Sequence, residues 1–542
     1  MKLKNDKNYN PEVQLVSTVF GGTGYHSRLK AGTTVHDTRL SANYALECLR
    51  EGGQEYVKRA TDIFDKLCSL QDVDPVSSTY GIWSWTYEET LEQMQPPDWN
   101  WADFIGARIA HALKLYPRLL PEDTVGRLRE ALAHAAWSIF RRNVAADYTN
   151  IAIMGAVVTA AAGELLDLSM FLKYARRRLA SVLDSVKANG SFSEYNSPTY
   201  TVVVIEELDR LSLLVSDPEC NSIGDKLWFH AWEIVAEHFH PPTLQWAGPH
   251  ARSYSDLLRP NTQHWLTAAT GIVFPDQEKE ENDLIVKPRP CPPELQPRFR
   301  KLPESEFTVV RQFAIGKTGP VTGTTWMSEK SCLASINRAC TWVQRRFLVG
   351  YLKIPAGVAV LKLSVLLNGL EFPGFRVFQQ QTGSRVLSAF QPLFGTGYYH
   401  PTLDAISDGI IDCEDLRFRY TLLSRDVRTD SLSDGRFSLS TEGFHAVITP
   451  AVSAFNGIPV NWKPVEIDGG VAVDAIVYCG SRKQINMAEA TMRIATGLEL
   501  VSNQDKALPV PVSMEPVSGN KILAEWGSLS VEVPTESERF TW

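Results

Sequence analysis

The chain has 542 residues, of which 44% are hydrophobic, and a formal net charge of −8 at pH 7. A chain of this length buries more than one core, so we expect two or three domains. Acidic and basic residues are mixed along the chain, so nucleic acid is not an expected partner. No apolar run reaches the ~18–20 residues that cross a bilayer, so no membrane span is expected.

The first 14 residues carry charges but no apolar segment, so no signal peptide is visible. We expect a cytoplasmic protein, or a secreted protein whose leader has been removed. The eight cysteines contain no CxxC pair. This pattern favours neither a zinc ribbon nor a disulfide scaffold.

Between about residues 37 and 270 the apolar residues recur with the helical period, in segments separated by short polar or Pro/Gly breaks. Successive helical hairpins bury their apolar faces by packing side by side, so we expect an incomplete α/α toroid with a cleft on its loop face. The predicted helices are 38–50, 54–70, 101–115, 124–142, 150–166, 169–187, 199–215, 225–239 and 255–270.

The pattern changes after this region. Residues 276–304 are rich in charge and proline and are predicted to be a linker. Short runs with strand character follow, separated by Gly, Asn, Asp and Ser. We therefore expect a toroid domain over 1–275 and an antiparallel β-sandwich domain over 305–542.

A helical toroid followed by an antiparallel β-sandwich resembles the heparinase II/III-like family and the related alginate, hyaluronate and chondroitin lyases, without indicating one of them. The resemblance implies a polysaccharide or oligosaccharide substrate containing uronic acid, cleavage by β-elimination, and no cofactor. It leaves the oligomeric state and the identity of the glycan open.

Residues 81–104 combine tryptophans with carboxylates in a loop before a helix. Aromatic faces stack on sugar rings and carboxylates bind hydroxyls, so we expect substrate contacts here. The alternative is a buried loop that fills the ring and caps the next helix. The residues predicted to bind substrate are Trp83, Trp85, Glu88, Trp99, Trp101 and Asp103.

Two further segments lie at predicted helix starts. The resemblance implies that Asn150 neutralises the substrate carboxylate, although an ordinary N-cap explains it equally well. In residues 189–200, Glu194 is a candidate for substrate binding, and the resemblance implies that Tyr195 or Tyr200 acts as acid, base or both. The alternative is that these tyrosines pack on the rim of the ring.

Residues 245–254 form a Gly-Pro loop in which three functional side chains alternate. His250 is predicted to move a proton, Arg252 to bind a carboxylate and Tyr254 to serve the leaving oxygen, with Trp246 contacting substrate. A rim loop whose arginine pairs with a surface acid is the alternative. The nearby histidines have no zinc spacing, so no metal is predicted.

Two segments of the second half, residues 340–346 and 398–400, are predicted either to close the cleft or to pack between the domains. Two other functions remain open. One is a glycoside hydrolase on the same fold, with a pair drawn from Glu88, Glu89, Asp98, Asp103 and Glu194. The other is a glycan-binding protein without catalysis.

Overall fold

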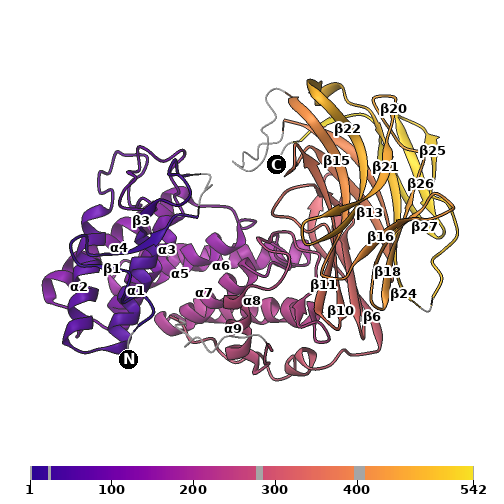
Figure 1. The fold of residues 1–542 in the computed structure, drawn as a ribbon. Coiled ribbons are helices and arrows are strands. Elements are labelled where there is room, and N and C mark those ends of the chain that lie inside the picture. The colour runs from indigo at the N-terminus through magenta and orange to yellow at the C-terminus, as the bar shows by residue number, and fades with distance from the viewer. Residues whose placement is uncertain (1–2, 22–25, 276–284, 396–408, 504, 541–542) are drawn as a thin grey trace.

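The computed structural model describes residues 3–21, 26–275, 285–395, 409–503 and 505–540. Helices occupy the first half and sheets the second, and Figure 1 shows the two halves side by side, with helices α5 to α8 between the first helices and the sheets. An incomplete α/α toroid followed by an antiparallel sandwich is the architecture that the sequence predicts. The residues predicted at 398–400 lie outside the described part of the chain.

The helices pair as hairpins in two layers, with α1, α3, α5 and α7 in contact in an inner row and α2, α4, α6 and α8 in an outer row. Their bounds are α1 Thr38–Glu51, α2 Gln54–Leu70, α3 Trp101–Leu115, α4 Glu122–Arg142, α5 Thr149–Leu165, α6 Ser169–Asn189, α7 Tyr200–Leu214, α8 Pro218–His238 and α9 Pro260–Thr270. Because every second helix is an inner one, the inner helices run in the same direction and their N-terminal ends lie at one side of the toroid.

Local signals set the helix ends. The Asp37 side chain accepts a hydrogen bond from Leu40 N at 2.6 Å, and Asp217 accepts one from Cys220 N at 2.9 Å, which are N-cap contacts. Gly190 and Gly271 end α6 and α9 in the left-handed region. The predicted helix 225–239 is too short, because α8 begins at Pro218, directly after its Asp217 cap.

The helical half is not purely helical. Short antiparallel strands precede α1 and follow α8, namely β1 Tyr9–Asn10, β2 Leu15–Val19, β3 Thr34–His36, β4 Phe239–His240 and β5 Gln245–Trp246. The predicted helix 255–270 is correspondingly shorter, and begins at Pro260. These strands are two to five residues long, so they are additions to the helical domain and do not change its class.

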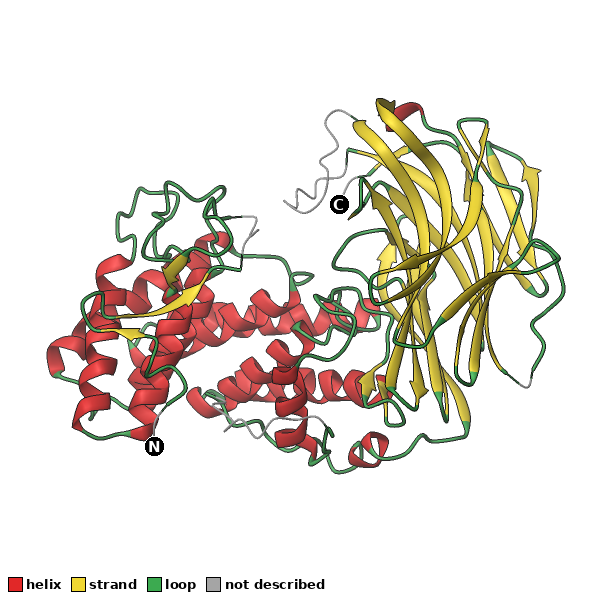
Figure 2. Cartoon of the chain, in the orientation of Figure 1, coloured by secondary structure: helices red, strands yellow, loops and turns green. Residues whose placement is uncertain are grey.

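The second half contains two large sheets and a smaller one (Figure 2), together with a sheet of two-residue strands in the order β20-β19-β23, with β19 Ala454–Phe455, β20 Ile458–Pro459 and β23 Met492–Arg493. The first has the order β21-β22-β15-β11-β10-β8-β7-β6 and the second β16-β17-β18-β24-β14-β13-β9, and every pair between these strands is antiparallel. Their bounds are β6 Glu306–Gly316, β7 Gly319–Ser328, β8 Ser331–Ile336, β9 Arg338–Cys340, β10 Leu348–Ile354, β11 Gly357–Leu367, β13 Phe375–Thr382, β14 Arg385–Phe394, β15 Ile410–Leu423, β16 Arg428–Ser431, β17 Phe437–Thr441, β18 Phe444–Pro450, β21 Asn461–Ile467, β22 Gly470–Asn486 and β24 Ala495–Ser502. The smaller sheet is β25 Ser513–Val517, β26 Lys521–Trp526 and β27 Leu529–Pro534.

Aromatic side chains join the two large sheets face to face. Phe418 of β15 lies 4.4 Å from Phe390 of β14 and 5.0 Å from Phe375 of β13, between ring centroids. Tyr420 bonds Thr496 across the same layer. This interior is the core of the sandwich.

Glycines in the helical domain permit close helix packing. A Cβ on Gly163 of α5 would lie 2.8 Å from Leu172 N of α6, whereas a Cβ on Gly126 of α4 would meet nothing within 4 Å. We expect Gly163→Ala to destabilise the protein by about 1–3 kcal/mol through overpacking. Gly126→Ala should stabilise it by about 0.5–1 kcal/mol through helix propensity. Urea unfolding of both variants checks this, and equal effects at the two positions would contradict it.

Candidate functional site

The site predicted from the sequence lies at the N-terminal ends of the inner helices. Trp101 Nε1 donates to Thr38 Oγ1 at 2.9 Å, which joins the starts of α3 and α1. Asn100 Nδ2 donates to Tyr148 Oη at 3.0 Å, which joins the starts of α3 and α5. Helix N-termini carry partial positive charge, so this side of the toroid favours anionic groups.

Glu194 is the centre of the contacts at this side. Its Oε2 accepts hydrogen bonds from the backbone N of Asn150 at 2.9 Å and from Asn150 Nδ2 at 2.6 Å, and its Oε1 accepts one from Arg252 Nη1 at 2.9 Å. The Glu194 side chain is 10% exposed and that of Arg252 is 19% exposed. Three predicted residues from three separate segments therefore meet directly.

Arg252 also holds two tyrosines. Its guanidinium carbon lies 4.4 Å from the Tyr200 ring centroid, and its Nη2 donates to Tyr254 Oη at 3.4 Å. The Tyr200 and Tyr254 hydroxyls are 2.7 Å apart, and Tyr254 is 38% exposed. The two hydroxyls therefore link the largely buried Arg252 to the accessible Tyr254.

The ionisable groups around Arg252 shift one another's pKa values. Burial lowers the pKa of Arg252, but Tyr200, Tyr254 and Glu194 outweigh it and raise that pKa, so the guanidinium is cationic. Burial raises the pKa of Tyr200, and Arg252 offsets part of the rise. The result is a protonated phenol beside a fixed positive charge.

Asn150 carries an unused acceptor. The residue is 1% exposed, and its Oδ1 has no hydrogen-bond partner among the described residues. Buried polar atoms normally have a partner. A donor from a bound molecule, such as a sugar hydroxyl, would satisfy this oxygen.

Two residues of the site were missed as candidates. Gln344 of the sandwich domain accepts a hydrogen bond from Arg252 Nε at 2.9 Å, which confirms that residues 340–346 reach the toroid. Tyr148 is bonded through Asn100 to Arg142, whose Nη1 donates to Asn100 Oδ1 at 2.7 Å. Tyr148 lies two residues before Asn150, and this closeness in sequence is a signal for it. Nothing in the sequence around Gln344 indicates that its partner is Arg252.

The structure corrects the predicted positions of Tyr195, His250 and Trp246. Tyr195 is 0% exposed, its hydroxyl lies 2.7 Å from His238 Nε2 and its ring stacks on Phe313 of β6 at 4.7 Å. His250 is 1% exposed, with Nδ1 2.6 Å from the carbonyl oxygen of Asn196. Trp246 bonds the Asn196 side chain in the same interior. The Tyr195 side chain and the His250 backbone, which pairs with Arg346, contact the sandwich, and all three side chains are buried away from a substrate surface.

The predicted aromatic loop divides into core and rim. Trp83 is fully buried with Nε1 donating to Leu67 O, and Trp101 is 7% exposed, so both are packing residues. Trp85 is partly buried, stacks on Trp101 at 5.2 Å and donates to Asp98 Oδ2 at 3.1 Å. Trp99 is also partly buried and donates to Ser78 O at 2.9 Å. Trp85 and Trp99 remain candidates for sugar contact.

The carboxylates predicted to bind substrate or to catalyse hydrolysis are either hydrogen-bonded within the chain or buried. Glu88 Oε1 lies 2.6 Å from His36 Nδ1, and Glu89 accepts from Arg28 N at 2.7 Å. Asp103 is 2% exposed, and burial raises its pKa to about 7. Asp103 therefore lies in the helical core and not on a substrate surface.

Buried histidines make stability depend on pH. Burial lowers the pKa of five of them, to about 3 for His111, His238 and His250 and to about 4 for His230 and His240. An unfolded histidine binds a proton near pH 6.5, so each contributes stability that is present above that pH and is lost as the pH falls, by up to about 1.4 kcal/mol per pH unit. Asp103 and Glu206, with pKa raised to about 7, act in the opposite sense.

Buried carboxyl groups with raised pKa offset this loss, so the histidine contribution is measured against a variant. Between pH 6 and pH 5 the free energy of unfolding of His250→Asn should fall less steeply than that of wild type, by up to about 1.4 kcal/mol per pH unit. Urea titrations at several pH values measure both slopes, and equal slopes would contradict the buried, neutral state of the His250 ring.

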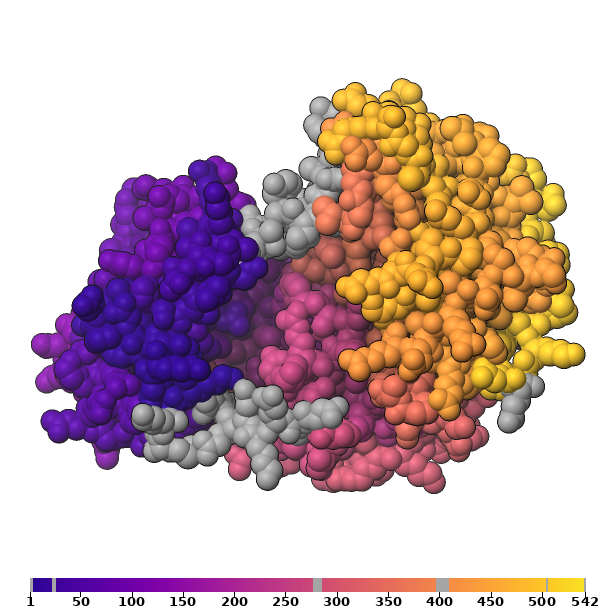
Figure 3. All heavy atoms as spheres, viewed as in Figure 1, coloured from indigo at the N-terminus to yellow at the C-terminus, as the bar shows by residue number. Residues whose placement is uncertain are grey.

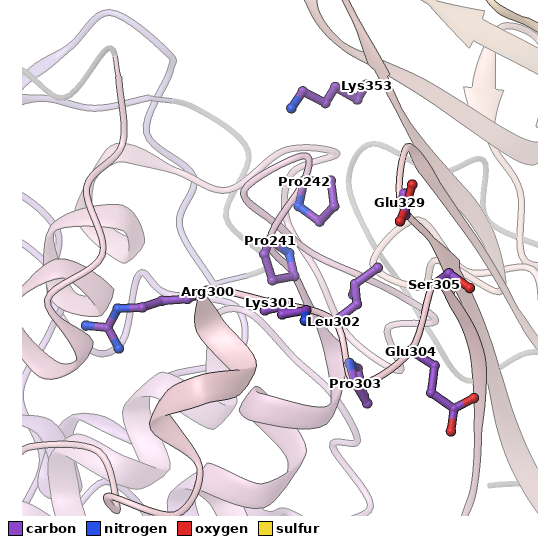
Figure 4. Close-up of a pocket in the computed structure, with 10 residues that line it drawn as sticks. All are labelled: Pro241, Pro242, Arg300, Lys301, Leu302, Pro303, Glu304, Ser305, Glu329 and Lys353. Atoms are coloured by element: carbon purple, nitrogen blue, oxygen red, sulfur yellow. The ribbon is translucent and has the colours of Figure 1, made fainter.

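Figure 3 shows the molecular surface hollowed between the N-terminal helices and the sandwich. A separate crevice of about 520 Å³ lies where the chain crosses from the toroid to the sandwich (Figure 4). It is lined by Pro241 and Pro242, the stretch 300–305, Glu329 and Lys353. Arg300 and Glu304 point to opposite sides of it in Figure 4, so their charges do not converge on one ligand.

Within the described ranges, no three His, Cys, Asp or Glu side chains are grouped to hold a metal ion. Over the same residues, no helix has both the length and the apolar character needed to span a membrane. The candidate site therefore consists of hydrogen-bonding groups, one buried ion pair and aromatic rings.

Residues 7–273 match the model of a family described as a domain of unknown function (DUF8769). No curated protein sequence matches the chain. Among solved structures, the chain is similar to heparinase III, with 11% identity and a TM-score of 0.42 over 92% of this chain and 82% of that one. It is similar to chondroitinase AC lyase, with 9% identity and a TM-score of 0.41 over 96% and 83%.

A third similarity is to Ara127N-Se, a GH127 beta-L-arabinofuranosidase from Geobacillus stearothermophilus T6, with 11% identity and a TM-score of 0.25 over 90% and 76%. At these identities and scores the likenesses assign no activity to this chain.

Proposed function

We propose that the protein is a polysaccharide lyase that cleaves a uronic-acid-containing glycan by β-elimination at the cluster of Asn150, Glu194, Tyr200, Arg252 and Tyr254. The observation that carries the proposal is that Arg252 holds the hydroxyl pair of Tyr200 and Tyr254, 2.7 Å apart, beside Asn150 and its unused buried oxygen. These groups combine charge stabilisation with proton transfer, which is what elimination beside a carboxylate requires.

The reaction moves one proton and breaks one C–O bond. The proton leaves C5 of the uronate, a double bond forms between C4 and C5, and O4 departs with a proton. Arg252 Nη2 donates only a 3.4 Å bond to Tyr254, so it is available to the substrate carboxylate as negative charge develops there. Tyr254 is the accessible proton carrier: its hydroxyl gives its own proton to the departing O4 as it takes the proton from C5, so it ends the step protonated as it began, with Tyr200 as its hydrogen-bonded partner.

Glu194 is a positioning residue in this account. Its carboxylate takes the backbone N–H and Nδ2 of Asn150 together with Nη1 of Arg252. The Oδ1 atom of Asn150 has no such partner and is left for a ligand. This differs from the role implied by the resemblance, in which the asparagine itself neutralises the carboxylate.

The hydrolase alternative needs two accessible carboxyl groups at a set separation. Among the five candidates, Glu88 is hydrogen-bonded to His36, Glu194 is ion-paired with Arg252, and Glu89, Asp98 and Asp103 are buried. No contact of the described residues favours such a pair.

A screen of uronic acid polysaccharides tests the proposal, with product followed by the ultraviolet absorbance of the unsaturated uronate. We expect absorbance to rise together with new reducing ends. Reducing ends without absorbance would establish the hydrolase, and binding without either product would establish a glycan-binding protein.

A further inference from the structure

Three arginines lie together on the inner helices, separate from Arg252; Arg39 is partly exposed, whereas Arg108 and Arg210 are buried, at 9% and 2% exposed. Arg39 is the second residue of α1, Arg108 lies in the middle of α3 and Arg210 lies in the second half of α7. The guanidinium carbon of Arg39 is 4.3 Å from the Phe104 ring centroid, and Arg108 Nη1 donates to the Phe104 carbonyl oxygen at 3.2 Å. We call these three residues the arginine surface.

The negative charge around this surface is smaller than the positive charge. Glu207 accepts from Arg210 Nε at 3.1 Å and lies 3.9 Å from Arg108 Nη1. Arg210 Nη1 also lies 3.0 Å from His111 Nδ1, and Arg108 Nε donates a hydrogen bond to Asn43 Oδ1 at 2.9 Å. Within the described part of the chain, the Arg39 side chain has neither a hydrogen bond nor an ion pair, so its donors are available.

Glu206 is the other acid beside the arginine surface. Burial and the neighbouring Glu207 raise its pKa to about 7, while Arg210 and Arg108 lower it and Asp209 adds a smaller rise. Its side chain is partly exposed. Near neutral pH, Glu206 is therefore often protonated and leaves the surface with excess positive charge.

Helix α7 connects the candidate site to the arginine surface. Tyr200 is the first residue of α7 and Arg210 the eleventh. With ~1.5 Å of rise per residue, ten residues separate them by roughly 15 Å along the helix. A glycan that occupies both places has to span at least about this length.

We propose that Arg39 and Arg108, supported by Arg210, form a second anion subsite that binds a carboxylate or sulfate ester of the glycan. Guanidinium groups bind such planar or tetrahedral oxyanions through paired N–H donors. The glycan part of the proposal rests on the proposed lyase function, whereas the anion site itself is testable with simple ions.

Isothermal titration calorimetry of the full chain with sodium sulfate and, separately, sodium acetate tests the subsite. At least one ion should bind saturably, and Arg39→Gln should weaken that binding about tenfold or more, since a hydrogen bond to a charged group is lost. Glu206→Gln should strengthen it above pH 7, where Glu206 is charged, and should match wild type below pH 6. Tyr254→Phe is the control and should bind the ion as wild type does.

No saturable binding of either ion, or wild-type affinity in folded Arg39→Gln, would overturn the subsite. These outcomes leave the proposed function untouched, because it depends on Tyr254 and Arg252. Conversely, a protein without lyase activity that binds sulfate through Arg39 would retain the subsite and lose the function. Preference for sulfate over acetate would indicate a sulfated glycan.

Discussion

Tyr254→Phe is expected to lower kcat by roughly 10²–10⁴-fold, the usual cost of removing a positioned proton-transfer group. The change deletes only a hydroxyl that is bonded to Tyr200 and Arg252, on a residue that is 38% exposed. Packing changes little, so the thermal unfolding midpoint should stay near that of wild type. Initial rates from product absorbance, measured with saturating glycan, check the prediction.

Tyr87→Phe is the matched control for this variant. Tyr87 is 44% exposed, and its ring contacts Lys66, so the same atom is removed from a distant phenol. Its kcat should equal that of wild type. A fully active Tyr254→Phe protein would remove the tyrosine pair from the reaction.

Glu194→Ala is expected to lower the free energy of unfolding by about 3–5 kcal/mol, because it leaves the largely buried Arg252 charge without its partner. It also leaves the Asn150 N–H and Nδ2 without their acceptor. Glu194→Gln keeps one acceptor and should cost less. Urea unfolding, monitored by tryptophan fluorescence, measures both.

Glu532→Ala is the control, since Glu532 pairs with Lys521 at 2.6 Å with both side chains about half exposed, at 53% and 43%. Loss of such a surface pair costs about 0–1 kcal/mol. Equal losses for Glu194→Ala and Glu532→Ala would show that the Glu194 contacts do not hold this site together.

The helices could be predicted from the sequence because their signals are local. Apolar periodicity and the breaks at Gly190 and Gly271 lie within or beside the segments they define, whereas the equally local Asp217-Pro218 start of α8 was missed. The strands before α1 and after α8 were missed, since segments of two to five residues give little periodicity.

The candidate site could be predicted only where its contacts are local or lie between helix starts. Asn150 and Tyr200 lie at the starts of α5 and α7, and Arg252 reaches them from the loop between β5 and α9. Tyr195 and His250 have equally polar neighbours in sequence, but their environment is set by Phe313 and Arg346 of the sandwich. Contacts between residues so distant in sequence leave no local pattern.

The central claim is that the chain cleaves its glycan by elimination, and the most direct measurement is the mass of the products formed in heavy-oxygen water. Elimination adds no water, so we predict a fragment that carries an unsaturated uronate at its new non-reducing end and is lighter than the hydrolysis product by one water molecule. The other fragment keeps the departing O4 at its new reducing end, so that end should contain no heavy oxygen when it is analysed before its anomeric oxygen exchanges with water. Products that gain a full water, with heavy oxygen at the cleaved linkage and no unsaturated uronate, would contradict the account.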